Sequence, residues 1–233
     1  MAIATSVAII GGGYAGMAAA VTLAQHNIPV TVFEAAAVLG GRARRVSVNN
    51  TLLDNGLHIL IGAYTETLRL IDIVAPQSTD VFLRTPLDWQ IHRKFRLRAP
   101  ALPAPLHLLA GLLTAQGMTF GDKLAVARFM QAMKARNYQL VQDCTVAALL
   151  REHTQPVDLI EYLWSPLCVA ALNTPAERAS AQVFLHVLRD SLGAGRAASD
   201  MLLARVDLTA LFPEPAADYV RARGGTIELN APV

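Results

Sequence analysis

The chain has 233 residues, a formal net charge of +2, and a composition that is 53% hydrophobic and 16% charged. This length and composition exclude a disordered chain and allow a core that needs no disulfide or metal, while the small net charge gives no reason to expect nucleic acid as a partner. No stretch reaches the roughly 18 uninterrupted apolar residues of a membrane span, and the N-terminus lacks the basic start of a signal peptide. We therefore expect a cytoplasmic protein. Cys144 and Cys168 are isolated thiols, so we expect them to be reduced and expect no metal site.

The N-terminal region predicts a strand, a glycine turn, a helix and a second strand. Residues 6–10, "SVAII", form a short β-branched run that is typical of a buried strand. Residues 14–27 are rich in the helix formers Ala, Met and Leu, and residues 28–34, "IPVTVFE", again resemble a strand. This order predicts a βαβ unit with parallel strands and a right-handed crossover, and therefore an α/β fold class with a Rossmann-like domain.

The next region predicts an antiparallel excursion from the first sheet. Residues 45–54, "RVSVNNTLLD", predict a hairpin that turns at Asn49-Asn50, because asparagine accepts the left-handed backbone of tight turns. Residues 65–75 predict a helix that ends before Pro76. Three strand-like runs follow, "VFLR", "LDWQIH" and "KFRLR", at residues 81–84, 87–92 and 94–98.

From residue 106 to residue 192 the sequence predicts mostly helices. Within residues 121–137 the apolar spacing predicts an amphipathic helix, with Leu124, Ala127, Met130 or Gln131, and Met133-Lys134 on alternating faces. Gly193 follows a further helical run and predicts its C-cap. The final segment predicts a helix that is opened by prolines, a glycine turn and a last strand at residues 226–229.

Three glycines with the spacing G-x-G-x-x-G connect the first strand to the first helix. Gly11 permits the tight turn, Gly13 leaves room for a pyrophosphate, and Gly16 lets the helix pack closely on the strand. Tyr14 and Ala15 complete this candidate set, because the start of the helix offers unpaired N–H groups to phosphates. Dinucleotide binding is the interpretation favoured here, and a purely structural glycine turn is the alternative.

An acidic residue ends the second strand, where the ribose of a dinucleotide would lie. The carboxylate of Glu34 can accept hydrogen bonds from ribose hydroxyls, and it would repel a 2′-phosphate. The sequence therefore favours FAD or NAD over NADP.

A second glycine cluster, "LGGRARR" at residues 39–45, follows the acidic residue after a short loop. It resembles the extension that distinguishes the FAD-containing relatives of amine oxidases and phytoene desaturases from simple NAD enzymes. The resemblance implies that Gly40, Gly41 and Arg42 approach the second phosphate and the flavin of FAD. The alternative is a glycine loop that carries a solvated basic run.

A third motif, "DNGLHILIGAY", has Asp54, Gly56 and His58 in the D-x-G-x-H pattern of the phytoene desaturase group. The resemblance implies that the backbone passes close to the isoalloxazine ring here, and glycine would permit that approach. His58 is either a hydrogen-bonded structural residue or an acid or base. No side chain is assigned as the catalytic group.

The helical middle of the chain carries a more selective resemblance. The segments "ALNTP", "VLRDSLG" and "PEPA" occur in the order that is typical of the squalene-associated FAD-dependent desaturases, whose characterised members are hydroxysqualene dehydroxylases of hopanoid synthesis. The resemblance extends from Val7 to Leu229, with Ala204 at a position where the family has proline. It implies reductive removal of a hydroxyl group from a C30 isoprenoid, with reduced FAD as the electron source.

The resemblance also implies a domain organisation. Residues 1–75 would form the N-terminal part of the FAD-binding domain, residues 76–205 a partial helical substrate domain, and residues 206–233 a return towards the FAD domain. The C-terminal part of the family fold would be absent from this chain. We therefore expect uncovered apolar edges, poor solubility, weak FAD retention, and a second polypeptide that supplies the missing half.

A lipophilic substrate needs an apolar site, and residues 106–192 are the candidate lining, with an ordinary helical core as the alternative. Basic residues lie before and within this region, and we expect either a peripheral contact with an anionic membrane or a solvated basic face. These residues are Arg84, Arg93, Lys94, Arg96, Arg98, Lys123, Arg128, Lys134 and Arg136. A carotenoid desaturase, an amine oxidase and a non-catalytic remnant remain as alternative functions.

Overall fold

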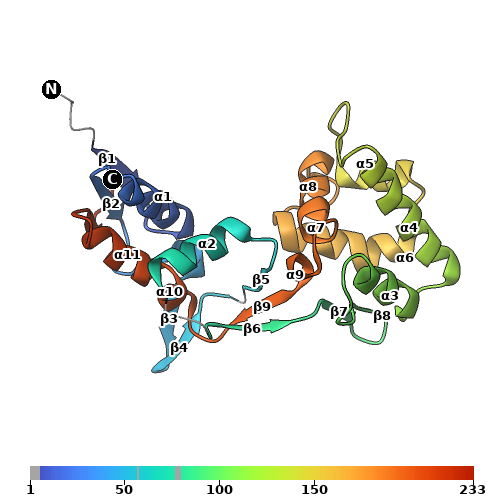
Figure 1. Cartoon of the computed structure of the whole chain (residues 1–233), viewed down its shortest axis with the longest axis horizontal. Helices are drawn as coiled ribbons and strands as arrows, with labels where there is room; N and C mark the ends of the chain where they lie inside the picture. Colours follow the sequence, from blue (N-terminus) through green and yellow to red (C-terminus); the bar gives the residue numbers. More distant parts are fainter. Residues whose placement is uncertain (1–5, 57, 77–79) are drawn as a thin grey trace. The chain divides into compact units, whose positions relative to one another are not determined.

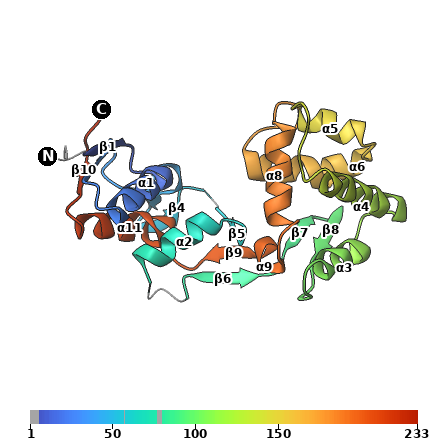
Figure 2. The same cartoon turned by 45° about the horizontal axis from the view of Figure 1, so that its top comes forward.

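The structure is a computed structural model that describes residues 6–56, 58–76 and 80–233 (Figures 1 and 2). The chain forms two compact units, and each contains its own hydrophobic core. The first unit comprises Met1–Leu60, Tyr64–Arg84 and Leu202–Val233, and the second comprises Ile61–Ala63 and Thr85–Met201.

A three-stranded parallel sheet forms the centre of the first unit. Its order is β1 (Val7–Ile10), β2 (Val30–Glu34) and β10 (Thr226–Leu229), so the last strand of the chain lies beside the second. The helices α1 (Tyr14–Gln25) and α11 (Pro213–Arg221) pack against each other in this unit (Figure 1). The βαβ unit and the final strand therefore lie where the sequence places them.

The two faces of this sheet differ in burial. Alternate residues such as Val30 and Val32 are buried in a core with Met17 of α1 and Val220 of α11. The opposite face includes Ile10, whose relative exposure is 70%. Parallel sheets are normally covered on both faces, and among the described residues the helices cover only one.

A hairpin and two further helices complete most of the first unit. Strands β3 (Arg45–Val48) and β4 (Thr51–Asp54) pair antiparallel. Asn49 and Asn50 turn the chain between them with φ angles of 49° and 62°, as the sequence predicts. The remaining helices are α2 (Thr65–Val74), which buries Leu70 and Ile71 in the same core, and α10 (Leu208–Leu211).

A third sheet contains the points at which the chain leaves and re-enters the first unit. Its order is β5 (Leu60–Ile61), β9 (Met201–Ala204) and β6 (Phe82–Thr85). Because β6 and β9 take part in this pairing, the first unit extends to Arg84 and resumes at Leu202. The sequence-based boundaries after residues 75 and 205 therefore differ from the division in the structure, since isolated strand-like runs do not reveal their partners.

The second unit is mostly helical and begins with a hairpin of β7 (Asp88–Ile91) and β8 (Phe95–Arg98). Seven helices and one π-helical turn follow in this described part of the chain. They are α3 (Leu106–Thr114), α4 (Phe120–Ala135), α5 (Val146–Glu152), α6 (Val157–Leu159), η2 (Ile160–Trp164), α7 (Ser165–Leu172), α8 (Ala181–Ser191) and α9 (Arg196–Ser199).

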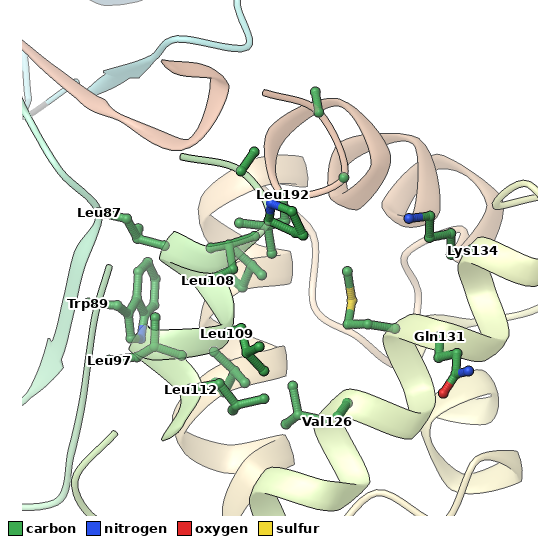
Figure 3. A pocket seen from close by; sticks show the side chains of 18 of the residues that line it. Leu87, Trp89, Leu97, Leu108, Leu109, Leu112, Val126, Gln131, Lys134 and Leu192 are labelled. Atoms are coloured by element: carbon green, nitrogen blue, oxygen red, sulfur yellow. The ribbon is translucent and has the colours of Figure 1, made fainter. Parts of the chain in front are cut away.

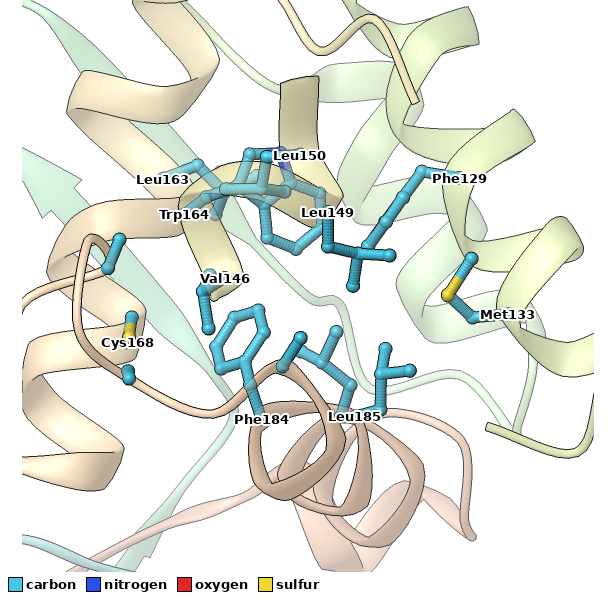
Figure 4. Packing of buried hydrophobic residues seen from close by; sticks show 14 of the residues in the cluster. Phe129, Met133, Val146, Leu149, Leu150, Leu163, Trp164, Cys168, Phe184 and Leu185 are labelled. Atoms are coloured by element: carbon cyan, nitrogen blue, oxygen red, sulfur yellow. The ribbon is translucent and has the colours of Figure 1, made fainter. Parts of the chain in front are cut away.

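Aromatic rings form the centre of the second core (Figure 4). Trp164 makes edge contacts with Phe129 at 5.1 Å and with Phe184 at 6.4 Å between ring centroids. Its indole N–H donates to the side-chain oxygen of buried Gln155 at 2.9 Å, which satisfies the only polar atom of the tryptophan side chain.

Two details of the helices differ from the sequence-based expectation. Of the residues named from the spacing in α4, Met133 lies on the buried face with Val126 and Phe129, whereas Leu124 and Ala127 are exposed, because the apolar spacing fits more than one face. Gly193 comes after the cap residue of α8 and does not adopt a left-handed conformation. Glycine is favoured there because a Cβ atom would lie 2.7 Å from the backbone carbonyl oxygen of Arg189.

Candidate functional site

The glycine turn between β1 and α1 has space for a ligand beside bare backbone. Gly11 has a φ of +102°, and a Cβ atom built on it would meet nothing within 4 Å. A Cβ atom on Gly13 would meet only the Cα atom of Gly41, at 3.8 Å. Gly13 is also the N-cap of α1 and offers no side chain to its first N–H groups. The geometry fits a pyrophosphate bound to backbone N–H groups at the positive end of a helix.

Gly16 has the packing role that the spacing predicts. A Cβ atom on Gly16 would lie 1.9 Å from the carbonyl oxygen of Gly11, so no larger residue fits unless α1 moves away from the turn. The side chain of Ala15, in contrast, is exposed. Close contact at Gly16 holds the start of α1 against the end of β1.

Glu34 is fixed at the carboxyl end of β2, beside the glycine turn. Its Oε2 accepts a hydrogen bond of 2.6 Å from the backbone N–H of Gly12, and its Oε1 accepts one of 2.8 Å from the N–H of Ala36. Each carboxylate oxygen can accept a second hydrogen bond. The carboxylate is therefore oriented by the backbone and retains capacity for ribose hydroxyls.

The second glycine cluster lies against the first. Gly40 donates a backbone hydrogen bond of 2.9 Å to the carbonyl of Gly12 and forms a bridge with Gly13. Gly40 and Gly41 have φ angles of 108° and 57°, and a Cβ atom on Gly41 would lie 3.2 Å from the Cα of Gly13. The structure thus brings the two predicted motifs together into one glycine-lined surface.

The arginines of the second cluster have different environments. Arg42 lies in the 3₁₀ turn η1 (Gly41–Ala43), its side chain is exposed, and its carbonyl accepts from Asn55 at 3.2 Å. Arg44 donates to the carbonyl of Gly41 at 3.2 Å. Among the described residues, the exposed guanidinium of Arg42 makes no hydrogen bond or ion pair, and its assignment to the cofactor stays a prediction.

The sequence interpretation missed residues on and beside α10 that fix the second glycine cluster. The hydroxyl of buried Thr209 accepts a hydrogen bond of 2.7 Å from the backbone N–H of Arg45. The guanidinium of Arg45 contacts Asp207 at 3.0 Å and Glu214 at 2.7 Å. These carboxylates raise the pKa of Arg45. The signal that could have indicated this role is the segment "RVDLT" at residues 205–209, which lies between the motifs "VLRDSLG" and "PEPA".

Tyr14 and Asp54 also bind α10 rather than point into the glycine turn. The Tyr14 hydroxyl donates to the carbonyl of Leu208 at 2.6 Å, and Asp54 accepts from the N–H of the same residue at 2.8 Å. Burial, followed by the charges of Asp54 and Asp207, raises the pKa of the Tyr14 hydroxyl well above its usual range. Tyr14 can therefore offer a cofactor its backbone N–H, while its side chain has a structural role.

The third motif forms a turn after β4. Gly56 has a φ of +95°, which requires glycine there, and its carbonyl lies 3.0 Å from Nδ1 of His58. The His58 side chain is exposed. This arrangement gives His58 a hydrogen-bonded structural position, and its approach to a flavin remains a prediction.

The second unit contains a cavity of about 620 Å³ that is lined mainly by apolar side chains (Figure 3). One wall comes from Leu108, Leu109 and Leu112 of α3, and facing side chains come from α4, including Val126. Other lining side chains are those of Leu87, Trp89 and Leu97 in the hairpin region and of Leu163, Trp164 and Leu192. Exposed lining residues, among them Gln131 and Lys134, show that the cavity opens to solvent. Part of the predicted apolar segment therefore lines a cavity, while another part forms the core.

Two of the basic residues that precede α3 make side-chain contacts within the chain. Arg96 makes two hydrogen bonds with Asp88, at 2.9 and 2.6 Å, and this contact lowers the pKa of the carboxyl. Lys94 lies over the ring of Tyr162 at 6.0 Å from its centroid. No helix in residues 6–56, 58–76 and 80–233 is long and apolar enough to cross a membrane.

The chain is similar in sequence to several curated enzymes. It is 30% identical to the hydroxysqualene dehydroxylase of Rhodopseudomonas palustris over 97% of this chain and 53% of that protein. It is 30% identical to the hydroxysqualene dehydroxylase of Zymomonas mobilis over 95% of this chain and 52% of that protein. The 15-cis-phytoene desaturase of Synechococcus elongatus is 26% identical over 97% of this chain and 50% of its own length. The chain thus spans about half the length of the curated relatives it matches.

Solved structures share the fold at lower identity. An oxidoreductase from Methanosarcina mazei has a TM-score of 0.70 and 14% identity over 97% of this chain and 51% of its own. A putrescine oxidase has a TM-score of 0.62 and 18% identity over 98% of this chain and 51% of its own. The pattern of the family described as flavin containing amine oxidoreductase matches residues 14–233, which include Gly16, Glu34, Gly40 and Gly41 and begin directly after Gly13. The chain belongs to the family of flavin-containing amine oxidoreductases.

Proposed function

We propose that this chain is part of an FAD-dependent oxidoreductase of isoprenoid lipid metabolism, which reductively dehydroxylates hydroxysqualene to squalene in hopanoid biosynthesis. The observation that carries the proposal is the similarity to three hydroxysqualene dehydroxylases, at 28% to 30% identity, along nearly the whole chain. The apolar cavity in the second unit supports it, because a C30 isoprenoid with one hydroxyl group needs a long apolar site.

The first unit would hold the adenosine and pyrophosphate part of FAD. Gly11 and Gly13 leave the backbone open to the pyrophosphate, and the start of α1 supplies N–H groups to its oxygens. Glu34 would accept hydrogen bonds from the ribose hydroxyls. Gly40 and Gly41 would carry the backbone along the second phosphate towards the flavin.

The proposed reaction breaks the carbon–oxygen bond of an allylic alcohol. When bound, reduced FAD supplies the hydride that replaces the hydroxyl group, and a proton joins the departing oxygen to give water. The apolar lining, such as Leu108, Leu112 and Trp164, would orient the hydrocarbon and exclude water from it. Because no described side chain is placed against the reacting carbon, we assign none to the proton transfer.

The proposal concerns the whole protein, and it includes a further polypeptide segment that covers the open face of the parallel sheet. That face exposes Ile10 and leaves Phe33 only partly buried. The segment would be supplied by a second polypeptide or by the same one. Exposure of this face gives a reason to expect low solubility and weak FAD retention when the chain is alone.

The test is an anaerobic reaction of the purified natural protein that contains this chain, with dithionite-reduced FAD and hydroxysqualene. We expect squalene to form in proportion to the hydroxysqualene consumed, as followed by gas chromatography and mass spectrometry. A matched reaction with oxidised FAD should give no squalene, because the electrons would be missing. If the flavin is bound and reduced and no squalene forms, the proposed substrate is wrong.

A carotenoid desaturase is the second candidate, and the similarity to 15-cis-phytoene desaturase over 97% of the chain favours it. This reaction runs in the opposite redox direction, because it removes hydrogen from the polyene. Incubation with phytoene and oxidised FAD, followed by absorption spectroscopy, separates the candidates. Longer-wavelength carotene bands without squalene formation in the first assay would establish the desaturase.

A further inference from the structure

Helix α3 exposes a row of leucines on one side. Leu106, Leu109 and Leu113 follow the helical spacing of one face, and their relative exposures are 50%, 50% and 57%. The opposite side packs into the second unit through buried His107 and Gly111. A helix that is apolar all round is normally buried on all sides, so this exposed leucine face requires a partner.

A second exposed apolar side chain lies near the end of this face. Phe120, the first residue of α4, has a relative exposure of 78%. The Nζ atom of Lys123 donates a hydrogen bond of 2.6 Å to the carbonyl of Leu113, and this bond ties the first turn of α4 to the last turn of α3. We use the name leucine face for Leu106, Leu109 and Leu113, with Phe120 beside its C-terminal end.

Most of the charged residues that flank the leucine face in sequence are basic. Residues 99–121 contain no Asp, Glu, Lys or Arg, whereas Arg98 precedes this segment and Lys123 and Arg128 follow it. Of the two nearest acidic residues in sequence, Asp88 binds Arg96 and also lies 3.9 Å from Nε of Arg98, and Asp122 caps α4 through Thr119. An apolar segment with basic residues on both sides matches the interface of an anionic lipid bilayer, where leucines enter the acyl region and cations remain among the headgroups.

The leucine face also adjoins the opening of the apolar cavity. Leu109 belongs to both, since it lines the cavity and is half exposed. Figure 3 shows Leu108, Leu109 and Leu112 of α3 on one side of the cavity and Val126, Gln131 and Lys134 of α4 on the other. An apolar ligand that leaves a bilayer at the leucine face would therefore reach the cavity without crossing water.

We propose that the leucine face of α3 docks onto the surface of an anionic phospholipid bilayer and that the apolar cavity is loaded from it. Leu106, Leu113 and Phe120 enter the interface, while Arg98, Lys123 and Arg128 contact lipid phosphates. This docking depends on neither bound flavin nor the proposed dehydroxylation of hydroxysqualene. It differs from a uniformly basic surface because the apolar face supplies part of the binding free energy.

The test is flotation of the purified natural protein that contains this chain, with vesicles of phosphatidylcholine alone and with vesicles that also contain phosphatidylglycerol. The wild-type chain should float with the anionic vesicles, and added salt should weaken this binding because it screens the basic residues. The double variant Leu106→Gln, Leu113→Gln should lower the bound-to-free ratio by roughly tenfold or more, since two leucines no longer enter the interface. Neither residue lines the cavity.

The matched control replaces two exposed valines elsewhere in the second unit, Val157→Gln and Val183→Gln, and should float like the wild type. Loss of flotation in the control as well would show nonspecific adsorption and overturn the proposal. Flotation of the leucine double variant at the wild-type level would do the same. If the wild type does not float with vesicles, and light scattering shows oligomers of the wild type that the leucine variant no longer forms, the face is instead an interface between copies. Since the assay contains no flavin or isoprenoid, its outcome is independent of the enzymatic test.

Discussion

The backbone N–H of Gly40 donates a hydrogen bond of 2.9 Å to the carbonyl of Gly12 and thereby joins the loop after β2 to the turn after β1. The bridge between Gly13 and Gly40 continues this contact. The two glycine motifs are therefore one backbone surface rather than two separate loops. Side chains added to this surface should affect cofactor binding and folding differently, according to what each added atom would meet.

Replacing Gly13 with alanine should weaken FAD binding while leaving the fold intact. The added Cβ atom would meet only Gly41, at an ordinary contact distance of 3.8 Å, but it would occupy the space beside the backbone that a pyrophosphate needs. We expect the Kd for FAD to rise by roughly tenfold or more, about 1.4 kcal/mol, in a flavin-fluorescence titration. The control Gly121→Ala, on the exposed first turn of α4, should bind FAD like the wild type. Unchanged affinity in Gly13→Ala would place the pyrophosphate elsewhere.

Replacing Gly16 with alanine should, in contrast to the change at Gly13, destabilise the fold itself. The added Cβ atom would lie 1.9 Å from the carbonyl oxygen of Gly11, so α1 would have to move away from β1. Overpacking of this kind costs about 1–3 kcal/mol, which urea denaturation followed by circular dichroism would measure. A variant as stable as the wild type would show that the helix and strand are not packed as closely as in this structure.

Replacing Glu34 with glutamine tests the role of its carboxylate in ribose binding. The amide keeps the size of the side chain, but its NH₂ group cannot accept from Gly12 or Ala36, and it binds a ribose hydroxyl without the assistance of charge. Hydrogen bonds to charged groups contribute about 1.5–3 kcal/mol, so we expect FAD affinity to fall by roughly tenfold or more. Glu228→Gln, on the exposed part of β10, is the matched control. Equal loss of affinity in both variants would indicate a general charge effect instead.

The part of the site that lies within one βαβ unit could be predicted from the sequence. The roles of Gly11, Gly13 and Gly16 follow from local spacing, because the turn, the helix start and the strand end are consecutive in the chain. Glu34 follows for the same reason, since the second strand must lie parallel to the first. The order of residues within the βαβ unit therefore specifies this part of the candidate cofactor site.

The contacts from α10 could not be predicted, because they join residues far apart in sequence. Nothing in the spacing of Thr209 indicates that its hydroxyl accepts from Arg45, which is 164 residues earlier. The leucine face was missed for another reason. The leucines of α3 occur on all sides of the helix, so periodicity does not show that Leu109 and Leu113 are exposed while Gly111 is buried.

Replacing Thr209 with valine should destabilise the first unit and weaken FAD binding together. Valine matches the size of the buried threonine but leaves the partly buried backbone N–H of Arg45 without its acceptor. An unsatisfied buried donor costs about 1–3 kcal/mol, and the loop at Gly40 loses a support. Thr226→Val on the exposed surface of β10 should change the free energy of unfolding by less than about 0.5 kcal/mol. If both variants are equally stable in urea, the Thr209 hydroxyl has no such role.

Replacing His107 with leucine should remove part of the acid sensitivity of the second unit. His107 is buried, and its Nε2 lies 3.2 Å from the hydroxyl of Ser199. Burial, followed by the charge of Arg196, lowers the pKa of its imidazole, while Asp200 acts in the opposite direction. Since the unfolded chain binds the proton more readily, stability is greatest above the unfolded value of 6.5 and falls as the pH drops towards the folded pKa.

The measurement is urea denaturation of the wild type and of His107→Leu on either side of this range, at about pH 7.5 and about pH 5.5. The wild type should lose more free energy of unfolding on acidification than the variant, because leucine has no proton to gain. Ser199 keeps a partner in the variant, since its hydroxyl also donates to the carbonyl of Arg196 at 2.9 Å. His92→Leu, at an exposed position in the β7–β8 turn, should retain the wild-type pH dependence. Parallel pH profiles for the wild type and His107→Leu would show that this imidazole is not protonated on unfolding.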